Sequence, residues 1–154
     1  MTATAAGVTI TELPPSPRIS LRLADPAGQP LPTRIGAREG AALCLGPDEW
    51  LLEGDGAAAL IAALPQPLSA VEVTDREITY ALEGPAVLDL LATGCPRDLA
   101  AMPVGSGART IFDSVQVVVT REAPGRFHLT VWRSFAPHVR ALLALAEREL
   151  AAGL

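Results

Sequence analysis

The sequence predicts an α+β domain with a mostly antiparallel sheet and helices packed on one face. The 154 residues are enough for one ordinary domain, and 49% of them are hydrophobic, which supplies a core. Short alternating runs joined by turn residues indicate β-hairpins. A hairpin followed by a helix occurs near each end of the chain, and this repetition favours two related half-units wrapped together.

The first 18 residues differ in character from the rest of the chain. Residues 1–18 contain Pro14, Pro15 and Pro17 and show no sustained hydrophobic period. We therefore expect an extended or mobile N-terminal arm outside the core. The single α+β domain is expected to span residues 19–154.

The first half of this domain shows strand and hairpin signals before a short helix. Residues 19–23 alternate apolar and polar side chains, as a half-buried strand does. Apolar runs at residues 41–45 and 50–53 flank a Gly-Pro-Asp-Glu turn and predict a hairpin. Residues 57–64 have helical spacing, and Pro65 ends the predicted helix.

The middle of the chain contains two further strands and a second helix. Residues 70–73 and 78–82 have strand character, and the second strand is expected to have one face in water. Residues 84–94 begin with Gly-Pro and end at a glycine, which predicts a helix with proline at its first position. Residues 95–107 are rich in proline and glycine and are expected to form a long surface connection.

The last part of the chain predicts a second hairpin and a long helix. Strand character at residues 110–112 and 115–120 is followed, after a Pro-Gly turn, by alternation at residues 127–131. Ser134 is the predicted N-cap of the final helix. Phe135 fits the start of the apolar stripe of that helix.

Net charge and residue usage exclude several classes of protein. The formal charge is -5, and all twelve basic residues are arginines spread among acidic residues, which argues against nucleic-acid binding. Without a lysine, the chain cannot form a Schiff base, anchor pyridoxal phosphate or build a phosphate loop. No apolar run reaches the roughly 18 residues of a membrane span, and no signal-peptide pattern precedes Arg18. We therefore expect a cytoplasmic protein that does not enter the membrane.

The histidines and cysteines have structural interpretations. His128 lies at an outward strand position and is expected to be solvated, and His138 is expected on the surface of the last helix. Cys44 lies between two leucines in a strand and is expected to be a small buried residue. Cys95 lies at a helix C-terminus, where the negative end of the dipole disfavours a thiolate, so a structural turn is expected.

No set of residues has the spacing that known chemistries need. The sequence contains no zinc-ligand pattern, no cofactor-binding glycine loop and no acid/base pair beyond ordinary turn and surface carboxylates. We therefore predict no catalytic, cofactor-binding or metal-binding residues in this chain.

Three sequence motifs follow one another along nearly the whole chain. They are Leu-Gly-Pro-Asp-Glu-Trp-Leu-Leu at residues 45–52, Leu-Glu-Gly-Pro-Ala running on to Gly-Cys-Pro-Arg-Asp-Leu at residues 82–99, and Val-Trp-Arg-Ser-Phe-Ala at residues 131–136. In order and separation they resemble the gamma subunit of bacterial heterotetrameric sarcosine oxidase. The chain departs from that family at residues 74–76, where Thr-Asp-Arg replaces Ser-His-Arg, and at residues 119–121, where a Trp commonly precedes the arginine.

The resemblance implies a fold like the folate-binding domain of the glycine-cleavage aminomethyltransferases. It also implies an assembly with alpha, beta and delta subunits. In that family the complex demethylates sarcosine to glycine and reduces oxygen to hydrogen peroxide, and the methyl carbon passes to tetrahydrofolate as 5,10-methylenetetrahydrofolate. FAD, FMN, NAD, tetrahydrofolate and zinc are then expected in the partner subunits and not in this chain.

The function expected from these observations is that of a noncatalytic accessory subunit. Trp50, Arg133 and Phe135 are candidate interface anchors, because Trp and Arg are enriched at interface hot spots. One alternative is the small subunit of a related N-methylglutamate dehydrogenase complex. Another is a free-standing folate-dependent methyl-transfer protein, for which Asp75 or Asp98 would have to serve as the acid or base.

Overall fold

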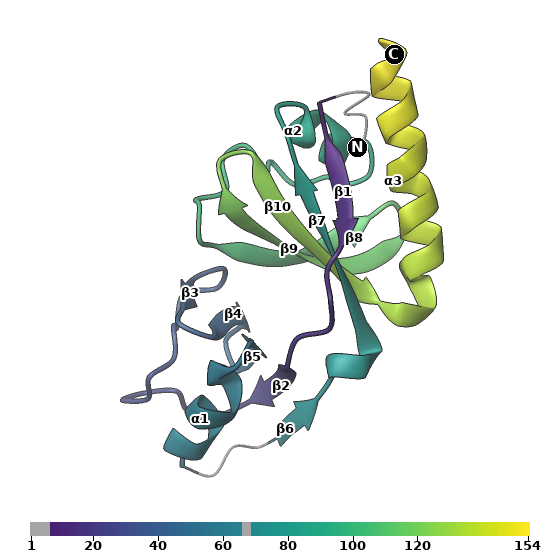
Figure 1. Ribbon diagram of the computed structural model, residues 1–154. Helices are drawn as coiled ribbons and strands as arrows, with labels where there is room; N and C mark the ends of the chain where they lie inside the picture. The colour runs from purple at the N-terminus through teal and green to yellow at the C-terminus, as the bar shows by residue number, and fades with distance from the viewer. Residues whose placement is uncertain (1–6, 66–68) are drawn as a thin grey trace.

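The described residues form ten strands, divided between two antiparallel five-stranded sheets (Figure 1). The computed structural model describes residues 7–65 and 69–154. The C-terminal sheet has the spatial order β1 (Thr9–Glu12), β7 (Glu77–Glu83), β10 (Arg126–Trp132), β9 (Val115–Ala123) and β8 (Gly107–Phe112). The N-terminal sheet has the order β3 (Arg38–Glu39), β4 (Ala42–Gly46), β5 (Glu49–Glu53), β2 (Arg18–Arg22) and β6 (Ser69–Glu72).

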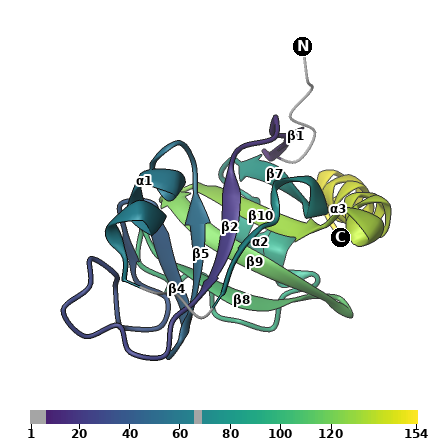
Figure 2. The ribbon, with the colours of Figure 1, turned by 90° about the horizontal axis from the view of Figure 1, so that it is seen from below.

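Helices cover the outer face of each sheet, and the inner faces lie against one another. α2 (Val87–Ala92) and α3 (Ala136–Ala151) pack on the C-terminal sheet, and α1 (Gly56–Ala63) packs on the N-terminal sheet. Figure 2 shows β2, β4 and β5 lying across β8, β9 and β10. The predicted α+β class and antiparallel pairing are confirmed, with the helices on one face of each of two sheets. No helix in the described ranges is long and apolar enough to span a membrane.

Each sheet has its own apolar core on the helix side. In the C-terminal core, Leu82 of β7, Val119 of β9 and Leu129 of β10 are fully buried against Leu143 of α3. Burial of each such leucine contributes about 2 kcal/mol. These side chains alternate with residues on the opposite face of the sheet, such as Thr120, Thr130 and Glu83, so the two faces of each strand lie in different environments.

The N-terminal core is smaller and is built around one tryptophan. Leu21, Trp50 and Leu52 of the sheet pack with Ala57 of α1, and all four are buried. The Trp50 indole Nε1 donates a hydrogen bond of 2.7 Å to the carbonyl oxygen of Pro32, which satisfies its polar atom. The predicted hairpin at β4 and β5 and the predicted helix at α1 are both present.

The two halves of the chain exchange edge strands. In the N-terminal half, β2 pairs with β5 of a β3-β4-β5 meander, and α1 follows. In the C-terminal half, β7 pairs with β10 of a β8-β9-β10 meander, and α3 follows. The second half starts at β6, just before β7, as the first half starts at β1, just before β2. Each of these leading strands pairs in the sheet of the other half, β6 with β2 and β1 with β7. The two related half-units expected from the sequence are therefore visible in the topology.

The N-terminal arm is not outside the core, contrary to the expectation for residues 1–18. Residues 9–12 form β1, which pairs antiparallel with β7, and Val8 is fully buried in the C-terminal core. Four residues are too few to show a hydrophobic period. The prolines that indicated an arm lie in the crossing from β1 to β2, where no sheet hydrogen bonds are needed. Residues 1–6 lie outside the described ranges.

Two other local expectations are corrected by the structure. The 95–107 connection is partly buried, because Leu99 and Met102 enter the C-terminal core and Arg121 Nη1 donates to the carbonyl oxygen of Met102 at 2.8 Å. Ser134 is not the N-cap of α3. It lies in the 3₁₀ turn η2 (Arg133–Phe135), and Phe135 holds the cap position without a side-chain hydrogen bond.

The Gly84→Ala substitution tests the packing of the N-terminal segment against the C-terminal sheet. Gly84 has φ of 141°, and a Cβ at this position would lie 1.8 Å from the carbonyl oxygen of Gly7. We expect the substitution to lower the free energy of unfolding by about 3 kcal/mol, measured by urea denaturation. Gly105→Ala is the matched control, since Gly105 also has a positive φ but faces open space, and it should cost only about 1 kcal/mol. Equal losses in the two variants would contradict this packing role.

Candidate functional site

The space between the two sheets holds charged side chains as well as apolar ones such as Leu43 and Leu51. Arg18, on β2, contacts Glu77, on β7, across this space. Two further pairs also join the sheets, Arg38 of β3 with Glu122 of β9 and Arg109 of β8 with Glu49 of β5. The face of β7 that the sequence predicts to be in water is therefore covered by the second sheet.

Arg18 is the most buried of these arginines. Its Nη1 donates to Glu53 Oε1 at 3.1 Å and lies 3.6 Å from Glu77 Oε2, while its Nη2 donates to Thr79 Oγ1 at 2.7 Å. The Thr79 hydroxyl also shares a hydrogen bond of 2.8 Å with the Thr130 hydroxyl. A buried guanidinium is stable only when its donors and charge are matched, and the residues around Arg18 supply this match.

A second group lies around Glu122. Arg38 donates two hydrogen bonds of 2.9 Å to the Glu122 carboxylate, and Thr120 donates a third at 2.7 Å. The Arg38 hydrogen bond is the main cause that lowers the pKa of Glu122 to about 2. His128 Nδ1 lies 3.4 Å from Glu122 Oε1. Burial lowers the pKa of His128, so the imidazole is neutral near pH 7.

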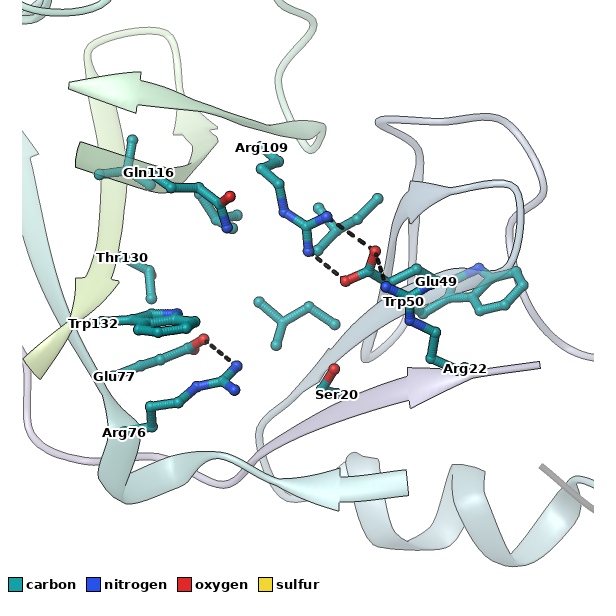
Figure 3. Close-up of a pocket in the computed structure, with 14 residues that line it drawn as sticks. Ser20, Arg22, Glu49, Trp50, Arg76, Glu77, Arg109, Gln116, Thr130 and Trp132 are labelled. Carbon is teal, nitrogen blue, oxygen red and sulfur yellow. Dashed lines mark hydrogen bonds and ion pairs between the residues drawn. The ribbon is translucent and has the colours of Figure 1, made fainter. Parts of the chain in front are cut away.

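A cleft of about 340 Å³ opens at one end of the space between the sheets (Figure 3). Both sheets contribute to its walls, and the lining is mainly polar. The polar and aromatic residues that line it are Ser20, Arg22, Glu49, Trp50, Arg76, Glu77, Arg109, Gln116, Thr130 and Trp132.

Glu49 is held on one side of the cleft by two arginines. Arg109 binds its carboxylate with both terminal nitrogens, one of them donating to Oε2 at 2.9 Å, and Arg22 Nη2 lies 3.3 Å from Oε2. The Arg109 hydrogen bond is the main cause that lowers the pKa of Glu49. Glu49 is therefore an anion near neutral pH and is poorly suited to accept a proton there.

A stacked pair forms the opposite side of the cleft. The Arg76 guanidinium carbon lies 4.8 Å from the centroid of the Trp132 ring, within the range of a cation–π interaction. Arg76 Nη2 also donates a long hydrogen bond of 3.4 Å to Glu77 Oε1. Trp132 remains 44% exposed. The cleft therefore presents guanidinium groups and one aromatic surface to solvent, a combination suited to binding anionic or planar groups.

The candidate anchors predicted from the sequence separate into two kinds. Trp50 is wrong as an interface anchor, because its side chain is fully buried in the N-terminal core and only lines the cleft wall. Arg133 is exposed, and its Nε donates to the carbonyl oxygen of Asp75 at 2.8 Å. Phe135 is 47% exposed and does not start the core stripe of α3. The role of Arg133 and Phe135 as interface anchors therefore stays a prediction.

Neither aspartate considered for proton transfer lies at the cleft. Asp75 is exposed on η1 (Thr74–Arg76), and Asp98 is exposed in the connection after α2, where its Oδ1 accepts a hydrogen bond of 3.3 Å from the Ala101 amide. The cleft lining contains neither residue. Asp98 serves a local turn, and nothing around Asp75 prepares it for acid or base chemistry.

The histidines and cysteines lie where their surroundings explain them. Cys44 and Cys95 are both buried, and burial raises the pKa of the Cys44 thiol. His138 is exposed beside Asp113, as expected for a surface residue. His128 is less exposed than expected, because its side chain is only 21% exposed and lies around a second pocket with Arg18 and Glu53 of the N-terminal sheet. In the described parts of the chain, no group of three or more His, Cys, Asp or Glu residues could hold a metal ion.

The sequence interpretation missed the residues that define the cleft. Arg22, Arg76 and Arg109 are far apart in the chain and carry no local motif. The one available signal was the tryptophan at position 132, an aromatic residue at a strand position whose neighbours Val131 and Thr130 are buried. Large exposed aromatics next to arginine are typical of binding surfaces.

An Arg18→Met variant tests the buried pairing. Removing the guanidinium leaves the Glu53 and Glu77 carboxylates without their partner, and we expect the free energy of unfolding to fall by about 3 kcal/mol or more. Adding Glu77→Gln to this variant removes one unmatched charge and should recover at least about 1 kcal/mol. Urea denaturation of both variants measures these changes. If the second substitution lowers the free energy of unfolding further, the destabilisation by Arg18→Met comes from lost packing and not from unpaired charge.

A Glu122→Gln variant tests the pH dependence of the second pair. Because the folded pKa of Glu122 is about 2, below the usual value of 4.5, its charge stabilises the fold above pH 4.5 and this contribution is lost as the pH falls toward 2. After allowance for solvent screening, we expect the wild type to exceed the variant by about 1–2 kcal/mol at pH 7. The difference in urea-denaturation free energy should shrink steadily below pH 4.5. A difference that is constant from pH 7 to 3 would contradict the ion pair.

Comparisons with known proteins place this fold. No protein-family model and no curated protein matches the sequence. A chain of the heterotetrameric sarcosine oxidase from Corynebacterium sp. U-96 is similar with a TM-score of 0.83 and 23% identity, over 97% of this chain and 88% of that chain. The glycine cleavage system aminomethyltransferase T from Bartonella henselae is similar with a TM-score of 0.60 and 17% identity, over 95% of this chain but only 50% of that chain.

Likeness at these identities shows the fold. The three sequence motifs resemble a subunit of this complex, and the structural comparison finds the same fold in one of its chains. This chain has the fold of a chain of heterotetrameric sarcosine oxidase, which is also the fold of half of aminomethyltransferase T.

Proposed function

We propose that this chain is the noncatalytic gamma subunit of a heterotetrameric sarcosine oxidase complex in the cytoplasm, with alpha, beta and delta subunits as its partners. The observation that carries the proposal is the likeness to a chain of that complex, with a TM-score of 0.83 over nearly the whole of both chains. The three motifs at residues 45–52, 82–99 and 131–136 support it independently, because they rest on residue identity and not on shape.

The proposed complex oxidises sarcosine to glycine with tetrahydrofolate and oxygen and releases 5,10-methylenetetrahydrofolate and hydrogen peroxide. FAD, FMN, NAD, tetrahydrofolate and zinc are assigned to the partner subunits. The chemistry of this chain supports that division. Its main cleft holds Glu49 as a carboxylate between Arg22 and Arg109, an arrangement that binds and does not transfer protons.

In this proposal the chain acts through its surface. Arg133 and Phe135 lie together in η2, between the end of β10 and the start of α3, and both are exposed. Arg133 is held by its bond to the Asp75 carbonyl, so its position is fixed before any partner binds. A fixed arginine beside an exposed aromatic ring loses little conformational entropy on association, which favours a stable interface.

One alternative has a specific observation behind it. The likeness to half of aminomethyltransferase T supports a protein that binds folate by itself. Such a protein needs an acid or base at its cleft, and Asp75 and Asp98 both lie outside the cleft lining. The small subunit of an N-methylglutamate dehydrogenase complex remains the other alternative, and it differs from the main proposal only in the amine that the complex oxidises.

Purification of the tagged full-length chain from its native cells tests the proposal. We expect a yellow, flavin-bearing assembly with three other polypeptides that consumes oxygen and forms hydrogen peroxide when sarcosine is added. N-Methylglutamate in place of sarcosine separates the two amine-oxidising complexes. A colourless solitary species of 16.0 kDa would contradict the proposal.

The isolated chain provides the matching control. Titration with tetrahydrofolate, followed by calorimetry, should show no binding, and incubation with sarcosine should consume no oxygen. Tight folate binding by the chain alone would favour the free-standing folate protein.

A further inference from the structure

The mouth of the cleft presents positive charge on a protein whose formal net charge is -5. The side chains of Arg22, Arg76 and Arg109 are between 35% and 50% exposed. Glu49 and Glu77, which also line the cleft, are only 13% and 8% exposed, whereas Asp48 lies outside the lining, 3.5 Å from Arg22, and is 44% exposed. Within the cleft the arginines therefore shield the carboxylates, and a molecule that enters it meets guanidinium groups first.

Two of these arginines, Arg76 and Arg22, make only long contacts to the carboxylates of the described residues. Arg76 donates one hydrogen bond within the described chain, at 3.4 Å to Glu77. Arg22 contacts Asp48 at 3.5 Å and Glu49 at 3.3 Å, which are long distances for charged pairs. A guanidinium has five N–H donors in a fixed plane that matches a carboxylate. Each of these two arginines can therefore accept a further anionic partner without breaking a strong bond.

Two exposed aromatic side chains lie close together in the sequence at this end of β10. Trp132 lines the mouth, and Phe135, three residues later, lies outside the lining and is half exposed. A small anion bound between the arginines would leave both rings in water. A polypeptide segment would cover them, and exposed aromatic surface beside arginine is typical of protein interfaces.

We propose that this cleft receives an acidic segment of a partner subunit, with an Asp or Glu carboxylate bound between Arg76 and Arg22 and a neighbouring apolar side chain on Trp132. The proposal rests on the proposed function, because it requires a partner protein. It adds the docking site and the charge of the segment that fills it. Charge complementarity selects an acidic occupant, and the extended aromatic surface selects a protein segment over a free small anion.

The Arg76→Glu variant tests the site in the full-length chain bound to its partners. Reversing this charge should raise the dissociation constant of the complex at least tenfold in biolayer interferometry. Arg126→Glu is the matched control, because Arg126 has a similar exposure and lies at the opposite end of β10 from Trp132. It should change the constant less than threefold. Urea denaturation of both variants confirms that each is folded.

Oxidative footprinting of the wild-type chain gives a second readout that does not depend on a variant. Hydroxyl-radical oxidation of Trp132 should fall several-fold when the complex forms, while the fully buried Trp50 is unmodified in both states. If the complex forms and Trp132 stays fully reactive, the docking site is wrong and the proposed function stands. If the wild type binds no partner, both are wrong.

Succinate tests whether the cleft binds a free small carboxylate in place of a protein segment. Addition of succinate to the isolated chain should have no effect at millimolar concentration, observed as shifts of the arginine Nε–H resonances. Saturable binding at Arg76, together with an Arg76→Glu complex of normal affinity, would identify a small-carboxylate site and overturn the proposed segment.

Discussion

A buried arginine between two facing sheets is the constraint on which the rest of the structure depends. Arg18 reaches from β2 to the hydroxyl of Thr79 and the carboxylate of Glu77 on β7. Both inner sheet faces carry charges that water would otherwise solvate, so where these charges meet, guanidinium and carboxylate groups have to match. Charge pairing thus sets the relative position of the sheets, while the two outer cores set the packing of each sheet with its helices.

Local patterns predicted most of the secondary structure. The hairpin of β4 and β5, the helix α1 and the hairpin of β9 and β10 followed from alternation and turn residues within short windows. β1 was missed because four residues show no period and its partner β7 is distant in sequence. The alternating pattern correctly predicts strands at β7 and β10. It wrongly predicts that their polar side chains face water, because Glu77 and Thr79 contact Arg18 of the other sheet. Alternation is the same whether a polar face meets solvent or a second sheet of complementary charge.

The candidate site could not be predicted from local patterns. Arg38 and Glu122 are 84 residues apart and Arg109 and Glu49 are 60 apart, so no motif joins them. Three arginines and two glutamates from the two sheets line the cleft, and only the folded arrangement brings them together. Trp50 was interpreted as an interface residue because tryptophan is frequent at interfaces, yet the same property of large apolar area makes it the centre of a small core.

The exchange of edge strands has a consequence for how the chain folds during synthesis. β1 leaves the ribosome well before its partner β7, since Thr9 pairs with Glu83. Until then β1 is an unprotected edge, and the N-terminal sheet also waits for β6. The N-terminal sheet is incomplete until β6 has been made, and the C-terminal sheet is incomplete until β10 has been made. The nascent protein therefore stays open to chaperones, or to misplaced strand pairing, while these later strands are being made.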